Sequence, residues 1–277
     1  MENAGYERDA RSTVVRLKER GQYDYATIHR LIDTTAVLHV SFPPSGDDPF
    51  PAILPMLGCT GVFDPDGKKP EPHAAAPGSF PEDEDEEDYS TGPRCIYLHG
   101  HAASRLFKAP LPDRLPVCVA ATTMQGVVLA LTPFHNSCNY ASAVVHGYAS
   151  VVTNEAERMY ALTRITDNLV AHRWDNSRNP PTKAEMTTTG VLRIDIVSAS
   201  AKVRVGGPGD DRHDMKNESV INNVWTGVVP TYTVYGEPIP SDYNRVGKVP
   251  SYMKHWIERE NMRSKEEALS AVAKDKK

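Results

Sequence analysis

The sequence alternates between apolar, β-type runs and connections that are mostly too short to hold a helix. The runs cover residues 36–42, 52–59, 94–100, 116–123, 127–134, 142–153 and 191–205. A parallel neighbour needs a crossover of a dozen or more residues, so most of these runs must pair antiparallel. The pattern therefore predicts a mainly β protein with peripheral helices, folded as an antiparallel barrel or sandwich.

Four further segments are predicted to be helical, and they cover residues 7–20, 24–34, 155–170 and 251–274. Asn154 followed by Glu157 is typical of a capping box at the start of the third helix. Its apolar face would carry Met159, Leu162, Ile165 and Leu169. The last segment is charged and only moderately amphipathic, so we expect a solvated or subunit-capping tail.

Negative charge is concentrated in one stretch of the chain. Glu82–Asp88 holds seven consecutive acidic residues while the whole chain has a net charge of −5, so the remainder is nearly neutral. Nucleic-acid binding needs clustered Lys and Arg and is not expected. Residues 65–93 are rich in Pro, Gly, Ala and acid, which predicts a disordered insert because they can bury little apolar surface.

The cysteines and the apolar runs indicate a reduced, cytoplasmic protein. The four cysteines lie far apart, form no CxxC pair and follow no secretory signal; they are Cys59, Cys95, Cys118 and Cys138. No apolar run reaches the length of about 18 residues that a membrane span requires, so no membrane segment is predicted.

The stretch CIYLHGHAASRLF, residues 95–107, indicates a strand that ends at Gly100 and a helix that starts near Ala102. Free backbone N–H groups and the positive end of a helix at such a turn favour an anion. Ser104 adds a hydroxyl and Arg105 a bidentate cation, the combination that binds a phosphate. An ordinary strand-to-helix turn with a surface arginine fits the same residues.

Several histidines lie in or near these motifs. His99 and His101 would share one face of an extended strand, and His135 is the third candidate for a metal or haem ligand set. The glycine between the first two breaks the strand, so no metal site is predicted. Ser-His-Asp hydrolysis is also rejected, because no GxSxG elbow occurs.

Five segments in this order resemble the flavin-nucleotide-binding branch of the pyridoxamine 5′-phosphate oxidase-like proteins, which is related to the nitroimidazole-resistance proteins. They are GQYDYATIHRLID (21–33), YLHGHAASRLF (97–107), LALTPFHNSCNYASAVVHGYASV (129–151), TTTGVLRIDIVSASAKVRVGGPGDD (187–211) and VWTGVVP (224–230). The resemblance implies an FMN-binding split barrel over residues 1–240 and a helical tail over 241–277. It also implies a homodimer with flavin, FMN or FAD, in grooves between subunits.

The resemblance also assigns roles to residues. It implies that Ser104 and Arg105 hold the flavin phosphate, that the strand containing Pro55 and Met56 lies along the flavin ring, and that His99 is the acid/base group. Tyr140 is the second acid/base candidate. Further cofactor contacts are expected from His101, Ser142, Lys202 and Trp225. From the residues alone, Pro55, Met56 and Trp225 fit a buried core equally well, and Lys202, alternating with Arg204, fits a solvent-facing strand.

Two departures from the family pattern affect the expected site. Relatives often read NYRS where this chain has Ala141 between Tyr140 and Ser142, so a guanidinium is missing. They also often carry a small residue at the position of His101, and a histidine in place of Asn136. The expected pocket is therefore rearranged, which leaves its substrate open.

The sequence thus predicts a flavin-dependent oxidoreductase that passes hydride or electrons between the flavin N5 and a small organic substrate. True pyridoxamine-phosphate oxidation is not expected, because residues 230–277 lack that enzyme's Arg-His segment. The alternatives are a non-catalytic flavin- or haem-binding protein that has lost or changed its redox activity, and a purely structural protein.

Overall fold

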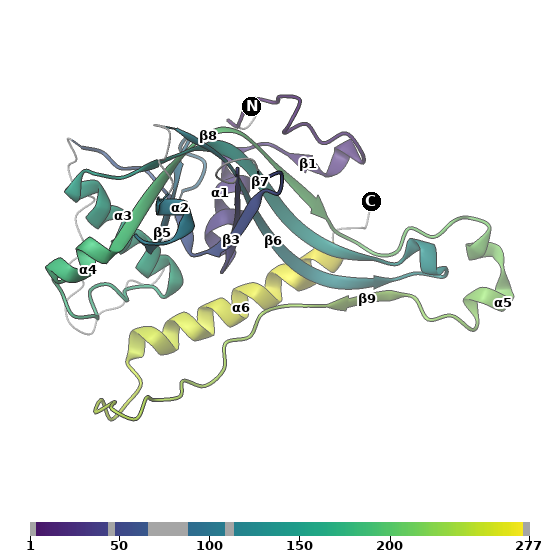
Figure 1. The fold of residues 1–277 in the computed structure, drawn as a ribbon. Helices are drawn as coiled ribbons and strands as arrows, with labels where there is room; N and C mark the ends of the chain where they lie inside the picture. The colour runs from purple at the N-terminus through teal and green to yellow at the C-terminus, as the bar shows by residue number, and fades with distance from the viewer. Residues whose placement is uncertain (1–3, 44–47, 66–87, 109–113, 274–277) are drawn as a thin grey trace.

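The computed structural model describes residues 4–43, 48–65, 88–108 and 114–273, without the side chains of Arg105 and Lys108 (Figure 1). Within these ranges nine strands form one antiparallel sheet in the order β3-β2-β6-β7-β8-β5-β4, with β1 added to β8 and β9 to β6. The predicted fold class is confirmed. The strands are β1 Gly21–Gln22, β2 Leu38–Phe42, β3 Ala52–Met56, β4 Gly58–Gly61, β5 Cys95–His101, β6 Leu115–Leu129, β7 Ser137–Val151, β8 Thr189–Arg204 and β9 Gly227–Pro230.

The two ends of this sheet are neighbours along the chain. β3 pairs with β2 and β4 pairs with β5, yet only Leu57 separates β3 from β4. One bent stretch, residues 52–61, therefore closes the sheet into a barrel that is split where the chain changes partner. The prediction of a single run over 52–59 missed this change, because both halves carry the same apolar composition.

The two runs predicted at 116–123 and 127–134 are one long strand. β6 continues through Gln125 with a β-bulge between Met124 and Gly126, and it pairs along its length with β7. A bulge inserts an extra residue without ending the strand. Gln125 and Gly126 looked like a turn in the sequence, while the true turn is the short 3₁₀ helix η2 at Pro133–His135.

Three of the four predicted helices form, as α1 Tyr25–Thr34, α3 Glu155–Leu169 and α6 Ser251–Ala273. The predicted helix over 7–20 is wrong, and only the 3₁₀ turn η1 Lys18–Arg20 occurs there. The Asp9 carboxylate accepts hydrogen bonds from the backbone N–H groups of Arg11 and Ser12, which closes a local turn. Leu17 then adopts a left-handed conformation (φ 57°) that ends any helix.

The remaining helices are short. They are α2 Arg105–Lys108, α4 Lys183–Thr188, η3 Asp214–Lys216 and α5 Glu218–Ile221. On α3 the buried residues are Ala161 and Ile165, whereas Leu169 of the predicted apolar face is half exposed.

Two apolar cores hold the barrel together. The larger one fills the barrel and includes Ile28 and Ile32 of α1, Leu98 of β5 and Leu192 of β8. The smaller one lies between α3 and the outer side of β4 and β5, around Cys59, Tyr97, Ala161, Ile165 and Val191. Successive residues of β5 therefore face different cores, because side chains alternate across a strand.

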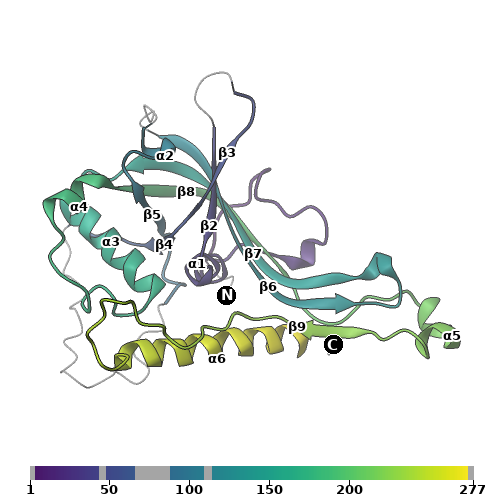
Figure 2. The same ribbon diagram turned by 60° about the horizontal axis from the view of Figure 1, so that its bottom comes forward.

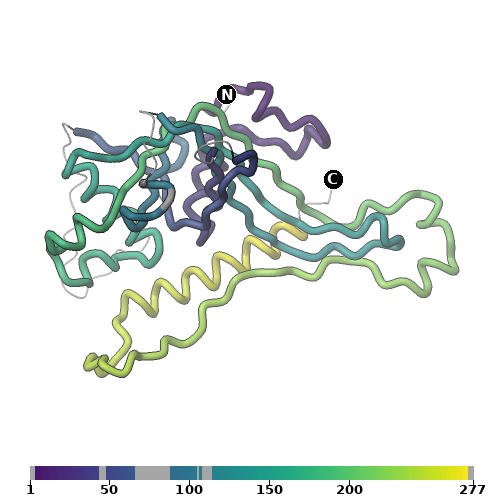
Figure 3. Tube along the Cα trace, viewed as in Figure 1, coloured from purple at the N-terminus to yellow at the C-terminus, as the bar shows by residue number. Residues whose placement is uncertain are grey.

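An arm projects from the barrel. The far halves of β6 and β7 and the strand β9 extend beyond it, and α5 lies at the arm's tip (Figures 1 and 2). Residues 231–250 then run without helix or strand alongside α6 (Figure 3). No described helix is both long and apolar enough to cross a membrane.

Candidate functional site

The turn between β5 and α2 is closed by internal hydrogen bonds. The backbone N–H of Ala102 donates to the Thr188 carbonyl (2.8 Å), that of Ala103 to Nδ1 of His101 (3.1 Å) and that of Ser104 to the His101 carbonyl (2.8 Å). The expectation that these N–H groups are free to bind an anion is therefore wrong. α2 has only four residues. Of the predicted phosphate contacts, the Ser104 hydroxyl lies at this turn, and the side chain of Arg105 is outside the described part.

Phe107 packs into a notch formed by two glycines. Gly100 on β5 and Gly190 on β8 are direct partners in the sheet. A Cβ atom on Gly190 would lie 2.4 Å from Cδ1 of Phe107, and one on Gly100 would lie 3.0 Å from Cε2. No side chain fits there, so the notch fixes α2 and the Ser104 turn against the barrel. The sequence signals for this close approach were Gly100 at the end of one predicted run and Gly190 directly before another.

His99 is partly buried on the side of β5 that faces α3. Its Nδ1 atom is shielded from solvent and has no hydrogen-bond partner in the described part of the chain. Burial lowers the pKa of His99, so its imidazole is mainly neutral near pH 7. Met56 contacts the opposite side of β5, near Gly100, and is 9% exposed in the barrel core.

An ion network next to His99 joins α3 to the barrel. Tyr97 donates to Glu157 (2.8 Å), and Arg193 binds both Glu157 (3.2 Å) and Asp195 (2.9 Å). Burial raises the pKa of Tyr97 well above its usual range and raises that of Cys95 to about 11. Both groups stay protonated near neutral pH, so the network positions α3 and supplies no nucleophile.

A second group of predicted residues lies on the outer face of β7 and β8. Tyr140, Ser142 and Lys202 are partly buried there, and Ser142 donates to the Lys202 carbonyl (3.2 Å) directly across the sheet. The sequence predicted that Arg204 would share a face with Lys202, but its side chain does not lie on this surface. It is 7% exposed and donates to the Asn139 side chain and to the Gly207 carbonyl (2.9 Å).

The predicted residues fall into separate groups within one chain. The sheet partner of His99 is Val191, which lies 11 residues along β8 from Lys202, a path of about 35 Å in an extended strand. Trp225 is 65% exposed on the arm, where its ring lies against Gly227. Pro55 is exposed on the edge strand β3, and His101 is exposed at the end of β5.

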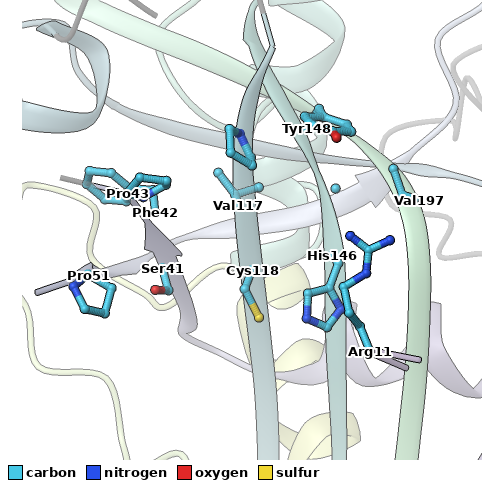
Figure 4. Close-up of a pocket in the computed structure, with 12 residues that line it drawn as sticks. Arg11, Ser41, Phe42, Pro43, Pro51, Val117, Cys118, His146, Tyr148 and Val197 are labelled. Atoms are coloured by element: carbon cyan, nitrogen blue, oxygen red, sulfur yellow. The ribbon is translucent and has the colours of Figure 1, made fainter. Parts of the chain in front are cut away.

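Sequence reasoning missed a shallow pocket of about 330 Å³ on the outer face, shown in Figure 4. His146 and Cys118, sheet partners on β7 and β6, line it together with Arg11. Burial raises the pKa of Cys118, so its thiol is not activated, and Asp9 already binds the Arg11 guanidinium. The other lining residues are Ser41, Phe42, Pro43, Pro51, Pro116, Val117, Gly147, Tyr148 and Val197.

Comparisons with known proteins agree with this architecture. A family model described as pyridoxamine 5′-phosphate oxidase matches residues 24–203. No curated protein matches the chain. The structure of the flavocytochrome Anf3 from Azotobacter vinelandii superimposes with a TM-score of 0.68 at 24% identity, covering 90% of this chain and 97% of that one.

A second solved structure is similar to the same extent. The FAD and heme binding protein from Mycobacterium smegmatis has a TM-score of 0.64 at 24% identity, covering 86% of this chain and 97% of that one. Both likenesses show the fold. The match to the family model ends at residue 203, so β9, residues 231–250 and α6 lie outside it.

Proposed function

Since the chain belongs to the pyridoxamine 5′-phosphate oxidase family, we propose that it binds a flavin nucleotide and acts as a flavin-dependent oxidoreductase on a small organic substrate. FMN is the proposed cofactor, with FAD as the alternative. When bound, the flavin would supply hydride or electron transfer through its N5 atom. The observation that carries the proposal is the enclosed, unpartnered Nδ1 of His99 next to the Ser104 turn.

An enclosed polar atom without a partner is rare in a folded protein, and a missing ligand is one of its ordinary explanations. His99 lies five residues from Ser104, at the end of β5 that leads into the turn. In this proposal the Ser104 hydroxyl and Arg105 bind the phosphate by charge-assisted hydrogen bonds. Pro55 and His101, which are both exposed, would contact the bound nucleotide, and Met56 would support it from the core.

His99 is the proposed acid/base group. Because burial keeps its imidazole neutral near pH 7, it has one nitrogen to accept a proton and one to donate a hydrogen bond. Tyr140 is the second proton-handling candidate. It lies with Ser142 and Lys202 on the outer face, far from His99 in the same chain, so the proposal requires a homodimer in which a second copy brings this group to the flavin.

The test is the visible absorption spectrum of purified protein, followed by titration with FMN and with FAD. We expect flavin that survives gel filtration in the wild type, and a loss of affinity of at least tenfold in Ser104→Ala and Arg105→Ala. Arg212→Ala, which removes an exposed guanidinium at the arm tip, is the matched control. A wild-type protein that binds neither flavin overturns the proposal.

The second candidate function is flavin or haem binding without turnover. It is favoured by the two similar structures, whose names describe a flavocytochrome and an FAD and heme binding protein. His101 is a poor haem ligand in this geometry. Its Nδ1 accepts from Ala103, so its Nε2 carries the proton when the ring is neutral. A Soret band on adding haem, lost in His99→Ala but not in His101→Ala, would support this candidate.

A further inference from the structure

The Ser104 turn is held by the short stretch of backbone where α4 passes into β8. The Thr188 carbonyl accepts from the backbone N–H of Ala102 (2.8 Å). Two residues later, Gly190 leaves the space that the ring of Phe107 fills. Figures 1 and 2 show α2, α3 and α4 together at the end of the molecule away from the arm. The backbone at the start of β8 therefore determines where the turn lies.

Arg158 of α3 holds this same stretch of backbone. Its Nη2 atom donates to the carbonyl of Met186 and to that of Thr189 (3.0 Å). These two residues stand on either side of Thr188, whose carbonyl bonds to the turn. The last carbonyls of a helix have no partner within the helix, so the arginine satisfies an acceptor at the end of α4 that the helix leaves open.

The part of α3 that carries Arg158 is itself attached to the barrel. The preceding residue, Glu157, accepts from Tyr97 of β5 (2.8 Å) and from Arg193 of β8 (3.2 Å). The Arg158 N–H donates to the carbonyl of Asn154, the residue that caps the helix (2.9 Å). The guanidinium is therefore presented from a backbone whose position is set by other contacts, as a supporting side chain requires.

We propose that Arg158 is a positioning residue that determines how tightly the Ser104 turn binds the nucleotide phosphate. It acts through the carbonyls at the start of β8 and the Ala102 N–H. Charge-assisted hydrogen bonds depend on geometry, so a turn displaced by about 1 Å loses phosphate contacts and leaves contacts to the flavin ring in place. The inference rests on the phosphate contacts of the proposed function and adds to them a residue outside the turn.

The experiment measures the dissociation constants of FMN, FAD and riboflavin, which has no phosphate, by flavin fluorescence. The variants are Arg158→Met, which removes every donor, and Arg158→Lys, which keeps the charge on a shorter side chain. Arg173→Met is the matched control, because Arg173 donates to the Tyr252 hydroxyl (2.8 Å) and lies beyond the other end of α3. Hydrogen exchange at the Ala102 amide is measured in the same proteins without flavin.

We expect the wild type to bind one of the two nucleotides at least about 100-fold more tightly than riboflavin. Arg158→Met should raise the dissociation constant of that nucleotide at least about tenfold and change that of riboflavin less than about twofold, with Arg158→Lys between the two proteins. The Ala102 amide should exchange faster in Arg158→Met than in the wild type. Arg173→Met should match the wild type in both measurements.

Three results would overturn the inference and leave the proposed phosphate contacts standing. They are equal weakening of nucleotide and riboflavin in Arg158→Met, the same loss of preference in Arg173→Met, and an unchanged exchange rate at Ala102. If Arg158→Met does not fold, an Arg158→Lys protein with the full wild-type preference overturns it as well. If the wild type binds riboflavin as tightly as either nucleotide, the phosphate contacts themselves are wrong and the role of Arg158 is wrong with them.

Discussion

At the scale of single residues, the position of the Ser104 turn depends on two glycines, which have no side chain. Gly100 and Gly190 are needed because the ring of Phe107 occupies the space where their Cβ atoms would lie. The proposed phosphate contacts, Ser104 and Arg105, precede this ring along the chain. A change in the notch is therefore transmitted to the turn through α2.

Gly190→Ala is expected to lower the free energy of unfolding by about 1–3 kcal/mol, because the new methyl group overlaps Phe107 and forces the ring to move. In a Phe107→Ala background the same substitution should cost less than about 1 kcal/mol. Urea denaturation of the four proteins measures both values. Gly236→Ala is the control, since a Cβ there meets nothing within 4 Å. Equal costs in both backgrounds would contradict the notch.

The protonation of His99 links stability to pH. Burial lowers its pKa in the folded protein below the ordinary value of 6.5, so the unfolded chain takes up this proton at a higher pH than the folded one does. The contribution of neutral His99 is complete above pH 6.5 and is lost as the pH falls through that value toward the folded pKa. We expect wild type to lose more free energy of unfolding between pH 7.5 and 5.5 than His99→Gln does.

The measurement for His99 is urea denaturation at the two pH values, with His213→Gln as the control. His213 is exposed next to η3, and its replacement should leave the wild-type difference unchanged. A His99→Gln protein with the same pH dependence as wild type would show that His99 takes up its proton equally in the folded and unfolded states.

At the scale of elements, the helices are held by particular end contacts. Asn154 caps α3 by accepting from the Glu157 N–H (3.0 Å), as predicted. The Glu157 carboxylate does not return to the cap, because Tyr97 and Arg193 bind it. α3 therefore has only the Asn154 half of a capping box. The Glu157 carboxylate, which would form the other half, attaches α3 to the barrel instead.

α6 is expected to detach from the arm in Ala268→Asp. Ala268 is fully buried but belongs to neither apolar core, so an unpaired carboxylate there would cost several kcal/mol at the helix contact and leave the barrel folded. Trypsin should then cleave faster at Arg245 and Lys248 in the segment held by α6. Leu269→Asp, next in sequence and 48% exposed, should be cleaved like wild type. Equal rates in the two variants would contradict the docking of α6.

At the scale of the whole molecule, the barrel and the arm carry different parts of the proposed site. His99 and Ser104 lie where β5 leaves the barrel, and Lys202 lies far along β8 on the outer face. Because these groups are separated along β8, the proposed function assigns them to different copies of the chain. In the proposed dimer, each flavin takes one group from each copy.

Subunit mixing tests this arrangement. Arg105→Ala and Lys202→Ala are each expected to weaken flavin binding, and equal amounts of the two, mixed by co-expression, should recover tight binding at about a quarter of the sites. Half of the dimers would then be mixed, and each would contain one site with both native residues. Flavin titration of the two single variants and of the mixture gives the fraction. No recovery in the mixture would show that both residues act within one chain.

Patterns among residues close in the sequence were enough to predict much of the fold. Short connections predicted antiparallel pairing. The helical segments that form α1, α3 and α6, and the Asn154 cap of α3, were readable because they depend on neighbours in the sequence. The predicted helix over 7–20 failed because the Asp9 side chain offers the backbone a competing turn, which helical periodicity does not register. The bulge in β6 was missed for a similar reason, since an extra residue looks like a turn until its partner strand is known.

The sequence by itself determined the family, the antiparallel class and the candidate residues, because these follow from motifs and from alternation along one strand. Only the tertiary structure decided which candidates meet. In the folded chain, the N–H groups of the predicted anion site form internal hydrogen bonds, and Met56 and Arg204 are buried. Tyr140 and Lys202 lie in a different group from His99. These outcomes depend on strand register and on which edge closes the barrel, and both are set by contacts between residues distant in the chain.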